Sequence, residues 1–349
     1  MFIHSVAHAT PETFIDQIQV EKLAEELFKN SSLDLEKYRP IFQNTEIDQR
    51  PILMPIEYYS KDKTFKEKND LFFETALELS EKSIRKCLEQ EKISPEEIGV
   101  FLLVTSSGFV TPTLDASLID KLGLSTDVLR LPLTGLGCCG GAYSLARAME
   151  YSKIFPNKKI LITTVETCTL TFRPSDKRTA NLVALSLFSD GASSMIVSSE
   201  HKKNSIQVLN SKSRKWRNSL DVMGWEVAND GLQVIFDKSI PALILKHFKE
   251  FSDEFLNENG LSYKDMKHFL YHPGGMKVLK AFARVLEIEL EQLKYSLQIL
   301  KNFGNLSSPT IFFVIEEFLN KKEFKLGEKG TMTAMGPGFS SELLSFITT

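Results

Sequence analysis

Short apolar runs alternate with helical patterns through the first two hundred residues of the chain. Apolar stretches of strand length occur at residues 100–105, 159–165 and 194–197. A long stretch at residues 66–91, with apolar positions at helical spacing, precedes the first of them. Because buried strands and amphipathic helices differ in period, this alternation predicts an α/β fold.

The same order of elements resumes after a polar stretch at residues 200–217. In the second part of the chain, helical patterns occur at residues 241–257 and 309–319, and apolar strands at residues 267–271 and 331–335.

A long helix followed by an apolar strand therefore occurs in both parts of the chain. We predict two similar α/β halves, residues 1–205 and 206–349, although no residue-level repeat is visible. No low-complexity linker separates them, so we expect the halves to pack tightly.

Length and composition are those of an ordinary soluble globular protein. The 349 residues exceed the usual size of a single core, and 42% are hydrophobic and 25% charged. The formal net charge of -3, without a sustained Lys/Arg block, argues against nucleic-acid binding. The N-terminus has no basic segment, and no apolar run approaches the roughly 18 residues that span a bilayer, so we expect a cytoplasmic protein.

Four cysteines occur, Cys87, Cys138, Cys139 and Cys168, without Cys-x-x-Cys spacing or a neighbouring His cluster. We therefore expect neither a disulfide framework nor a metal site. Cys87 shares a helical face with Ile84 and Leu88, which indicates core packing.

Cys138 lies at the glycine-flanked start of a helical pattern formed by Ala142, Leu145, Ala146 and Met149. The N–H groups and partial positive charge of a helix N-terminus can lower the pKa of a thiol, so Cys138 is a candidate nucleophile. The alternative is a small packing residue, because buried cysteines next to glycine are common in cores.

Two later segments offer partners for a nucleophile. His272, in Tyr-His-Pro-Gly-Gly, ends a predicted strand and is a candidate base. Asn305, in Gly-Asn-Leu-Ser-Ser-Pro, precedes a helix with an expected Ser cap, where its amide could stabilise an oxyanion. Read alone, each is better explained as an ordinary turn residue.

Taken together, these segments resemble the thiolase superfamily, and within it the chalcone synthase-like type III polyketide synthases. The matching motifs are Gly-Cys-x-Gly-Gly at Cys138, His-Pro-Gly-Gly at His272 and Gly-Asn-Leu-Ser-Ser at Asn305. Further matches are Phe-Arg-Pro-Ser-Asp from Phe172 and Met-Gly-Pro-Gly-Phe from Met335. The resemblance covers nearly the whole chain and implies a thiolase-like fold with a layered αβαβα core.

The resemblance also implies a mechanism and its substrates. Cys138 would be kept as a thiolate by His272 and its helix, and would take an acyl group from an acyl-CoA. His272 and Asn305 would promote decarboxylation of malonyl-CoA, whose enolate attacks the acyl thioester. Neither a metal nor a cofactor is implied beyond the CoA thioesters, and the family pattern implies a homodimer.

Family positions around the nucleophile carry over to a set of expected substrate-binding residues. Phe188 resembles the gatekeeping phenylalanine beside the nucleophile. The full set is Phe188, Cys168, Thr171, Val234, Ser307, Thr111, Gly336, Pro337 and Gly338.

Departures from the plant pattern bear on the substrate. Val234 replaces a second gatekeeping phenylalanine, which predicts a wider cavity, and the segment at Cys168 resembles bacterial enzymes that use long acyl starters. Thr111 replaces a methionine that enters the partner subunit's cavity. Arg50 is a candidate for the CoA phosphates, with a solvated surface arginine as the alternative.

We therefore expect decarboxylative condensation of malonyl-CoA onto a medium- or long-chain acyl-CoA, giving an alkylpyrone or alkylresorcinol. A β-ketoacyl carrier-protein synthase III and hydroxymethylglutaryl-CoA synthase share the Cys and His, but Asn305 argues against the latter. A non-catalytic acyl-binding scaffold is a further alternative, which would be expected to lose one of the three residues. Starter length, number of extensions and mode of ring closure are not encoded in any motif.

Overall fold

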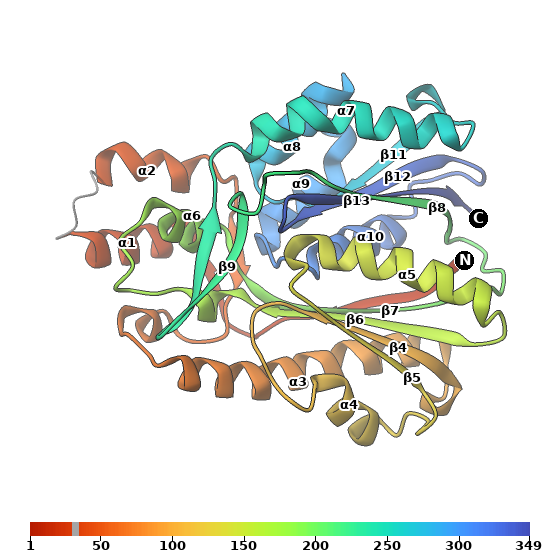
Figure 1. Cartoon of the computed structure of the whole chain (residues 1–349), viewed down its shortest axis with the longest axis horizontal. Helices are drawn as coiled ribbons and strands as arrows, with labels where there is room; N and C mark the ends of the chain where they lie inside the picture. The colour runs from red at the N-terminus through yellow and green to blue at the C-terminus, as the bar shows by residue number, and fades with distance from the viewer. Residues whose placement is uncertain (30–34) are drawn as a thin grey trace.

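The computed structural model describes residues 1–29 and 35–349, and its elements form five layers (Figure 1). Nine described strands form one sheet in the order β11-β12-β13-β8-β1-β7-β6-β4-β5. The two parts of this sheet meet where β1 and β8 share a single residue pair, Phe2 with Gln207.

The two parts of the sheet contain strands from different halves of the chain. The first contains β1 (Phe2–Ala9), β4 (Ile98–Thr105), β5 (Leu129–Thr134), β6 (Lys159–Thr167) and β7 (Asp190–Ser198). The second contains β8 (Ile206–Lys215), β11 (Met266–Tyr271), β12 (Lys329–Gly336) and β13 (Ser340–Thr348).

Helices cover and separate the two parts of the sheet. α3 (Phe65–Glu91) and α4 (Leu114–Leu122) pack on the outer face of the first part. α7 (Ile240–Glu258), α8 (Met276–Leu286) and α9 (Lys294–Phe303) pack on the outer face of the second. α5 (Gly140–Ile154) and α10 (Thr310–Lys321) lie between them in a shared core (Figure 1). The layered αβαβα arrangement is the one expected from the sequence.

The long predicted helix illustrates why local sequence specifies its element. α3 begins after Thr64, whose hydroxyl accepts from the Glu67 N–H while the Glu67 side chain accepts from the Thr64 N–H. One face is buried, and Cys87 on it is fully buried with its Sγ 3.0 Å from the Ser194 carbonyl oxygen. The predicted packing role of Cys87 is confirmed.

One polar segment forms a strand that its composition does not indicate. Residues 206–215, within the polar stretch expected to separate the halves, form β8 and pair along their length with β13. The pairing uses backbone groups, so half-exposed polar side chains such as Lys212 and Arg214 do not prevent it.

A smaller group of elements lies at one end of the layers, at the left in Figure 1. It comprises α1 (Gln17–Phe28), α2 (Leu35–Gln43), α6 (Thr179–Leu187), the hairpin of β9 (Met223–Ala228) with β10 (Gly231–Phe236), and the short pair β2 (Phe14–Asp16) with β3 (Gln49–Pro51). None of the described helices combines the length and apolar character needed to cross a bilayer.

Candidate active site

Cys138, His272 and Asn305 line one cavity with about 360 Å³ of empty space. They come from three separate segments, and 167 positions separate the cysteine from the asparagine. The other lining residues are mostly apolar: Met223, Phe236, Ile240, Ile244, Gly274, Val278, Phe282 and Met335. The structure thus brings together the three residues that the sequence singled out.

Cys138 is held in a single turn of 3-10 helix, Gly137–Cys139, that leads directly into α5. The Gly137 N–H donates to Ser106 Oγ at 3.0 Å. Gly137 has φ +47°, and a Cβ atom there would lie 2.8 Å from the Pro337 ring. This position therefore requires glycine, and the tight turn presents the half-buried thiol to the cavity.

His272 directly follows β11 and is 3% exposed. Its backbone N–H donates to the Thr333 carbonyl at 2.8 Å, which extends the pairing with β12 by one residue. Neither ring nitrogen has a hydrogen-bond partner among the described residues. Leaving a buried imidazole without hydrogen bonds costs free energy. The ring nitrogens are therefore available to bind a ligand in the cavity or to accept a proton from it.

The Asn305 side chain is fully buried between Cys138 and the residues after His272. Its Oδ1 accepts from the Ser307 N–H at 2.8 Å and lies 3.9 Å from the Cys138 Sγ. Its Nδ2 donates to the Gly274 carbonyl at 3.3 Å. That bond uses one of two N–H groups, so the second could donate to a substrate oxygen.

The main chain around Asn305 is fixed by a bridge to the end of α6. The Asn305 N–H donates to Leu187 and the Ser189 N–H donates to Asn305. Gly304 has φ +69°, and a Cβ atom there would lie 2.9 Å from the Leu187 carbonyl oxygen, so glycine is required.

The predicted Ser cap of the following helix is wrong. Pro309 occupies the N-cap of α10 without a side-chain bond. The Ser308 hydroxyl instead donates to Glu166 Oε1 at 2.7 Å, and the Ser106 N–H donates to the other carboxylate oxygen of Glu166. Glu166 therefore connects the loop before the helix to the loop that supports the Cys138 turn.

Burial acts on the thiol and the imidazole in the same way, by disfavouring each charged form. Desolvation raises the pKa of Cys138 to about 11 and lowers the pKa of His272 to about 3. These shifts oppose the thiolate expected from the helix N-terminus, because desolvation favours the neutral thiol. Among the described residues lining this cavity, His272 is the one base that can take up the thiol proton.

Phe188, Cys168 and Val234 meet in an apolar cluster together with Ala184. The Phe188 ring lies 5.8 Å from the Trp225 ring and 6.4 Å from the Phe236 ring. Three of the expected pocket residues are thus brought together.

A second cavity, with about 400 Å³ of empty space, lies on the other side of Phe188. Three expected pocket residues line it, Phe188, Cys168 and Thr171. Its remaining wall is mostly apolar and comes from α1, β3, α6 and the segments beside them: Ile15, Val20, Leu23, Arg50, Ile52, Ile56, Tyr59, Thr169, Phe172, Ala184 and Leu185. Sequence analysis did not predict the contribution of α1.

Val234 lines neither of these two cavities. It is 4% exposed and lies opposite Trp225 in the hairpin, in a cluster that also contains Phe236. The expected widening at this position is therefore not observed, because aromatic neighbours occupy the space.

The remaining expected residues surround the nucleophile or lie apart from it. Ser307 is buried next to Asn305 and has φ +60°. Gly336 and Pro337 pack against the turn at residues 136–139, where a Cβ atom on Gly336 would lie 2.6 Å from that of Cys139. Gly338 follows them beside Lys215, and Thr111 is exposed on the loop before α4.

Arg50 is neither a phosphate ligand at the surface nor a solvated side chain. It is 2% exposed, and its guanidinium donates to the Leu185 and Ser186 carbonyls and to Gln17 Oε1. Burial lowers the pKa of Arg50 to about 10, while the nearby Asp190 carboxylate opposes that shift. Arg50 therefore fastens the end of α6, and the expected role toward CoA is wrong.

Two residues that shape the site were not singled out, Trp225 and Phe236. A signal for them exists in Asn229-Asp230-Gly231, since Asp-Gly between apolar runs is typical of a hairpin turn. In the structure the two turn residues are Asn229 and Asp230, and the resulting register places Trp225 opposite Val234. No group of three or more His, Cys, Asp or Glu side chains suited to a metal occurs in the described part of the chain.

Two family models together match nearly the whole chain. The family model of the N-terminal domain of chalcone and stilbene synthases matches residues 2–201, and the model of the C-terminal domain matches residues 211–347.

Individual relatives span almost the whole chain. A Bacillus subtilis protein named “Putative chalcone synthase” is 37% identical, over 99% of this chain and 98% of its own length. An α-pyrone synthesis polyketide synthase-like protein, Pks18 of Mycobacterium tuberculosis, is 26% identical over 99% of this chain and 90% of its own.

Solved structures show the same fold. The 1,3,6,8-tetrahydroxynaphthalene synthase of Streptomyces coelicolor has a TM-score of 0.96 at 23% identity, with both chains fully covered. The C-terminal type III polyketide synthase domain of Steely1 from Dictyostelium has a TM-score of 0.91 at 26% identity, with 99% of each chain covered.

Proposed function

The chain belongs to the chalcone and stilbene synthase family and is a type III polyketide synthase with the thiolase-like fold, and we propose that it extends a fatty acyl-CoA with malonyl-CoA. The proposed products are alkylpyrones or alkylresorcinols. The proposed catalytic residues are Cys138, His272 and Asn305, which line the same cavity.

In the proposed loading step, the Cys138 sulfur attacks the thioester carbonyl of the starter acyl-CoA. His272 takes the thiol proton during the attack, because burial keeps both groups neutral beforehand. Asn305 donates a hydrogen bond to the oxyanion. CoA leaves as a thiol with that proton, and the acyl group remains on Cys138.

In the proposed extension step, malonyl-CoA occupies the cavity and loses carbon dioxide. Donors on His272 and Asn305 stabilise the enolate oxygen that forms, since charge develops there in a largely apolar cavity. The enolate carbon attacks the acyl carbon on Cys138. The new carbon–carbon bond replaces the thioester bond, so Cys138 is released and the extended chain is carried by CoA.

The second cavity is the observation that best supports a fatty acyl starter. It adjoins the catalytic cavity at Phe188, whose ring contacts the Phe236 ring that lines the catalytic cavity. Its wall is mostly aliphatic and aromatic, which suits an alkyl chain better than a polar starter. A movement of the Phe188 ring would join the two spaces and admit the chain. The relative named for α-pyrone synthesis supports the same product class.

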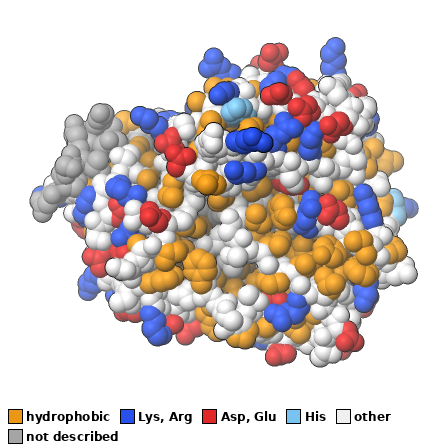
Figure 2. Space-filling model, in the orientation of Figure 1, with side chains coloured by type: hydrophobic (Ala, Val, Ile, Leu, Met, Phe, Trp, Pro, Cys, Tyr) orange, Lys and Arg blue, Asp and Glu red, His pale blue; other side chains and the backbone are white. Residues whose placement is uncertain are grey.

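We further propose that the enzyme acts as a homodimer in the cytoplasm. β5 is the outermost strand of the sheet, and its other edge has no partner strand among the described residues. Leu129 on this strand is 36% exposed and Ile154 at the end of α5 is 64% exposed. Figure 2 shows apolar side chains gathered across the middle of the face on which α5 lies. Such an edge and patch support pairing with a second copy.

The test is mass spectrometry of products made by purified protein from malonyl-CoA and acyl-CoAs from acetyl to stearoyl, beside the Cys138→Ala variant. Alkylpyrones or alkylresorcinols from the longer starters, absent from the variant, would support the proposal. A product from malonyl-CoA alone would exclude the fatty acyl starter. A single extension that requires malonyl on a carrier protein would favour a β-ketoacyl synthase III, and no product would favour a scaffold.

A further inference from the structure

The hairpin of β9 and β10 forms one wall of the site but belongs to neither part of the large sheet. Its two strands pair with each other, from Gly231 with Ala228 to Phe236 with Met223. Met223 and Phe236 line the catalytic cavity, and Val234 packs on Phe188. Because no third strand holds this pair, its position depends on side-chain contacts with the segment before α6.

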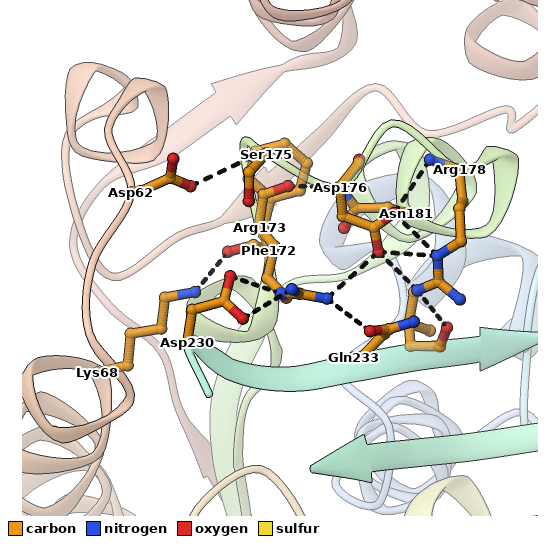
Figure 3. Close-up of polar contacts among 11 residues, drawn as sticks. Asp62, Lys68, Phe172, Arg173, Ser175, Asp176, Arg178, Asn181, Asp230 and Gln233 are labelled. Carbon is orange, nitrogen blue, oxygen red and sulfur yellow. Dashed lines mark hydrogen bonds and ion pairs between the residues drawn. The ribbon is translucent and has the colours of Figure 1, made fainter. Parts of the chain in front are cut away.

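Arg173 makes the principal contact at the turn of the hairpin. Its Nε lies 2.8 Å from Asp230 Oδ2 and its Nη2 lies 2.7 Å from Asp230 Oδ1, so the ion pair is bidentate. Its Nη1 donates to Gln233 Oε1 at 2.8 Å. All three guanidinium nitrogens therefore bind the hairpin (Figure 3).

Neighbouring groups hold Arg173 in place and extend the contact along β10. Asp176 lies 3.7 Å from Arg173 and also pairs with Arg178, whose Nη2 donates to the Val234 carbonyl at 3.3 Å. Asn181 Nδ2 donates to the carbonyls of Arg173 and Asp176, both at 2.8 Å. Figure 3 shows these side chains converging from the loop onto the strand.

Lys68 of α3 braces the same loop from the other side. Its Nζ donates to the Phe172 carbonyl at 2.9 Å, and the side chain is 6% exposed. We call Lys68, Arg173, Asp176, Arg178, Asp230 and Gln233 the Arg173 cluster. It connects α3, the loop before α6 and the hairpin.

The cluster is more than a set of surface ion pairs. The side chains of Arg173 and Asp176 are 15% and 6% exposed, and that of Asp230 is 31% exposed. Partial burial and bidentate geometry make such a pair stronger and more directional than exposed ion pairs, which contribute little to stability. A lysine at position 173 would keep the charge but could not bind Asp230 and Gln233 in this fork.

We propose that Arg173 is a positioning residue that sets which acyl starters the enzyme accepts, by holding the hairpin wall against Phe188. The inference rests on the proposed condensation reaction. Arg173 lines neither cavity, so it acts through Val234 and Phe236. When the cluster is broken, the hairpin packs less firmly against Phe188, which lies between the two cavities, and starters of different length are discriminated less sharply.

The kinetic test compares two starters, hexanoyl-CoA and stearoyl-CoA, in Arg173→Gln. The ratio of their kcat/KM values does not depend on how much protein is folded, so a merely structural loss does not move it. We expect the ratio to move toward unity by about tenfold, and Arg173→Lys to recover less than half of the change. Lys202→Gln, which breaks an ion pair with Glu91 on α3, is the control. An unchanged ratio in Arg173→Gln would overturn the proposal.

A second measurement does not require turnover. The chain has two tryptophans, and Trp216→Phe leaves Trp225, which lies on β9 opposite Val234. In that background, Arg173→Gln and Asp230→Asn should each raise acrylamide quenching of Trp225 at least twofold, with the double variant no higher than either one. Unchanged quenching would overturn the positioning role even if polyketides form. Increased quenching without polyketide product would instead contradict the proposed function.

Discussion

The two cavities on either side of Phe188 differ in what holds their walls. In the catalytic cavity, Cys138, His272 and Asn305 are presented by tight turns that require glycine at positions 137 and 304. In the second cavity, helices α1 and α6 contribute ordinary apolar side chains, and strand β3 contributes Arg50, which is bonded to the main chain at the end of α6.

This contrast separates chemistry from selectivity. Short motifs with fixed backbone conformations place the reacting groups, so their identity can be read in the sequence. The shape of the second cavity depends on packing among elements that carry no motif. Substitutions in the first cavity should therefore change rates, and substitutions in the second should change preferences.

The largest effect is expected from the polar wall of the catalytic cavity. Asn305→Ala and His272→Gln should each lower kcat for malonyl-CoA decarboxylation by about 10² to 10³, the loss typical of an oxyanion donor. Carbon dioxide release measures the step. His268→Gln is the matched control, because His268 lies on the same strand but pairs with Glu328 at 2.8 Å. An equal loss of kcat in His268→Gln would contradict the specific role of His272.

A smaller effect, on preference rather than rate, is expected from filling the second cavity. Ala184→Leu adds three carbons to its wall and should lower kcat/KM for stearoyl-CoA relative to hexanoyl-CoA by about tenfold, since each methylene in an apolar pocket contributes roughly 1–3 kcal/mol. Competition between the two starters measures the ratio. Val183→Leu, on the same helix but outside the cavity, should leave the ratio within about twofold.

The pH dependence of loading tests whether His272 acts as a neutral base. Burial lowers its pKa from 6.5 to about 3, so the imidazole stays ready to take a proton as the pH falls. Single-turnover transfer of the acyl group from acyl-CoA to Cys138 should therefore persist at pH 5. The fall in its rate at acid pH should have a midpoint well below pH 6.5. A midpoint at or above pH 6.5 would mean that burial does not lower the pKa of His272.

The same shift has a consequence for stability. A histidine with a lowered folded pKa is neutral in the folded state while the unfolded chain binds a proton below pH 6.5. Stability is then lost as pH falls from about 6.5 toward 3, and His272→Gln should reduce that loss in acid unfolding followed by circular dichroism.

The smallest effect is expected from Glu166, which connects the two loops behind the catalytic cavity. Burial raises its pKa to about 7, so its contribution to stability is present below about pH 4.5 and is lost as pH rises through 7. Glu166→Gln should lessen the fall in Tm between pH 5 and pH 8. Glu342, also buried with a pKa raised to about 7, retains part of the dependence. An unchanged fall would show that Glu166 does not contribute.

Element prediction was best where side-chain period and burial agree. The helix predicted at residues 66–91 is α3 (Phe65–Glu91), and the strand predicted at residues 100–105 is β4 (Ile98–Thr105) without its first two residues. β8 was missed because only its first residues are apolar, with Ile206 and Val208 buried, while residues 210–215 are polar and pair with β13 through the backbone. The place of β8 beside β13, and not a pattern in its own sequence, therefore determined that this segment forms a strand.

By itself the sequence determined the α/β order of elements and the identity of the three residues that meet at the catalytic cavity. Local periodicity suffices for the order of elements, and the motifs around the three residues, taken together, suffice for their identity. Tertiary structure decided the buried place of Arg50, the filling of the space beside Val234 by Trp225 and the raised pKa of Cys138. Each of these depends on desolvation and packing by residues distant in sequence, whose combined effect no local pattern records.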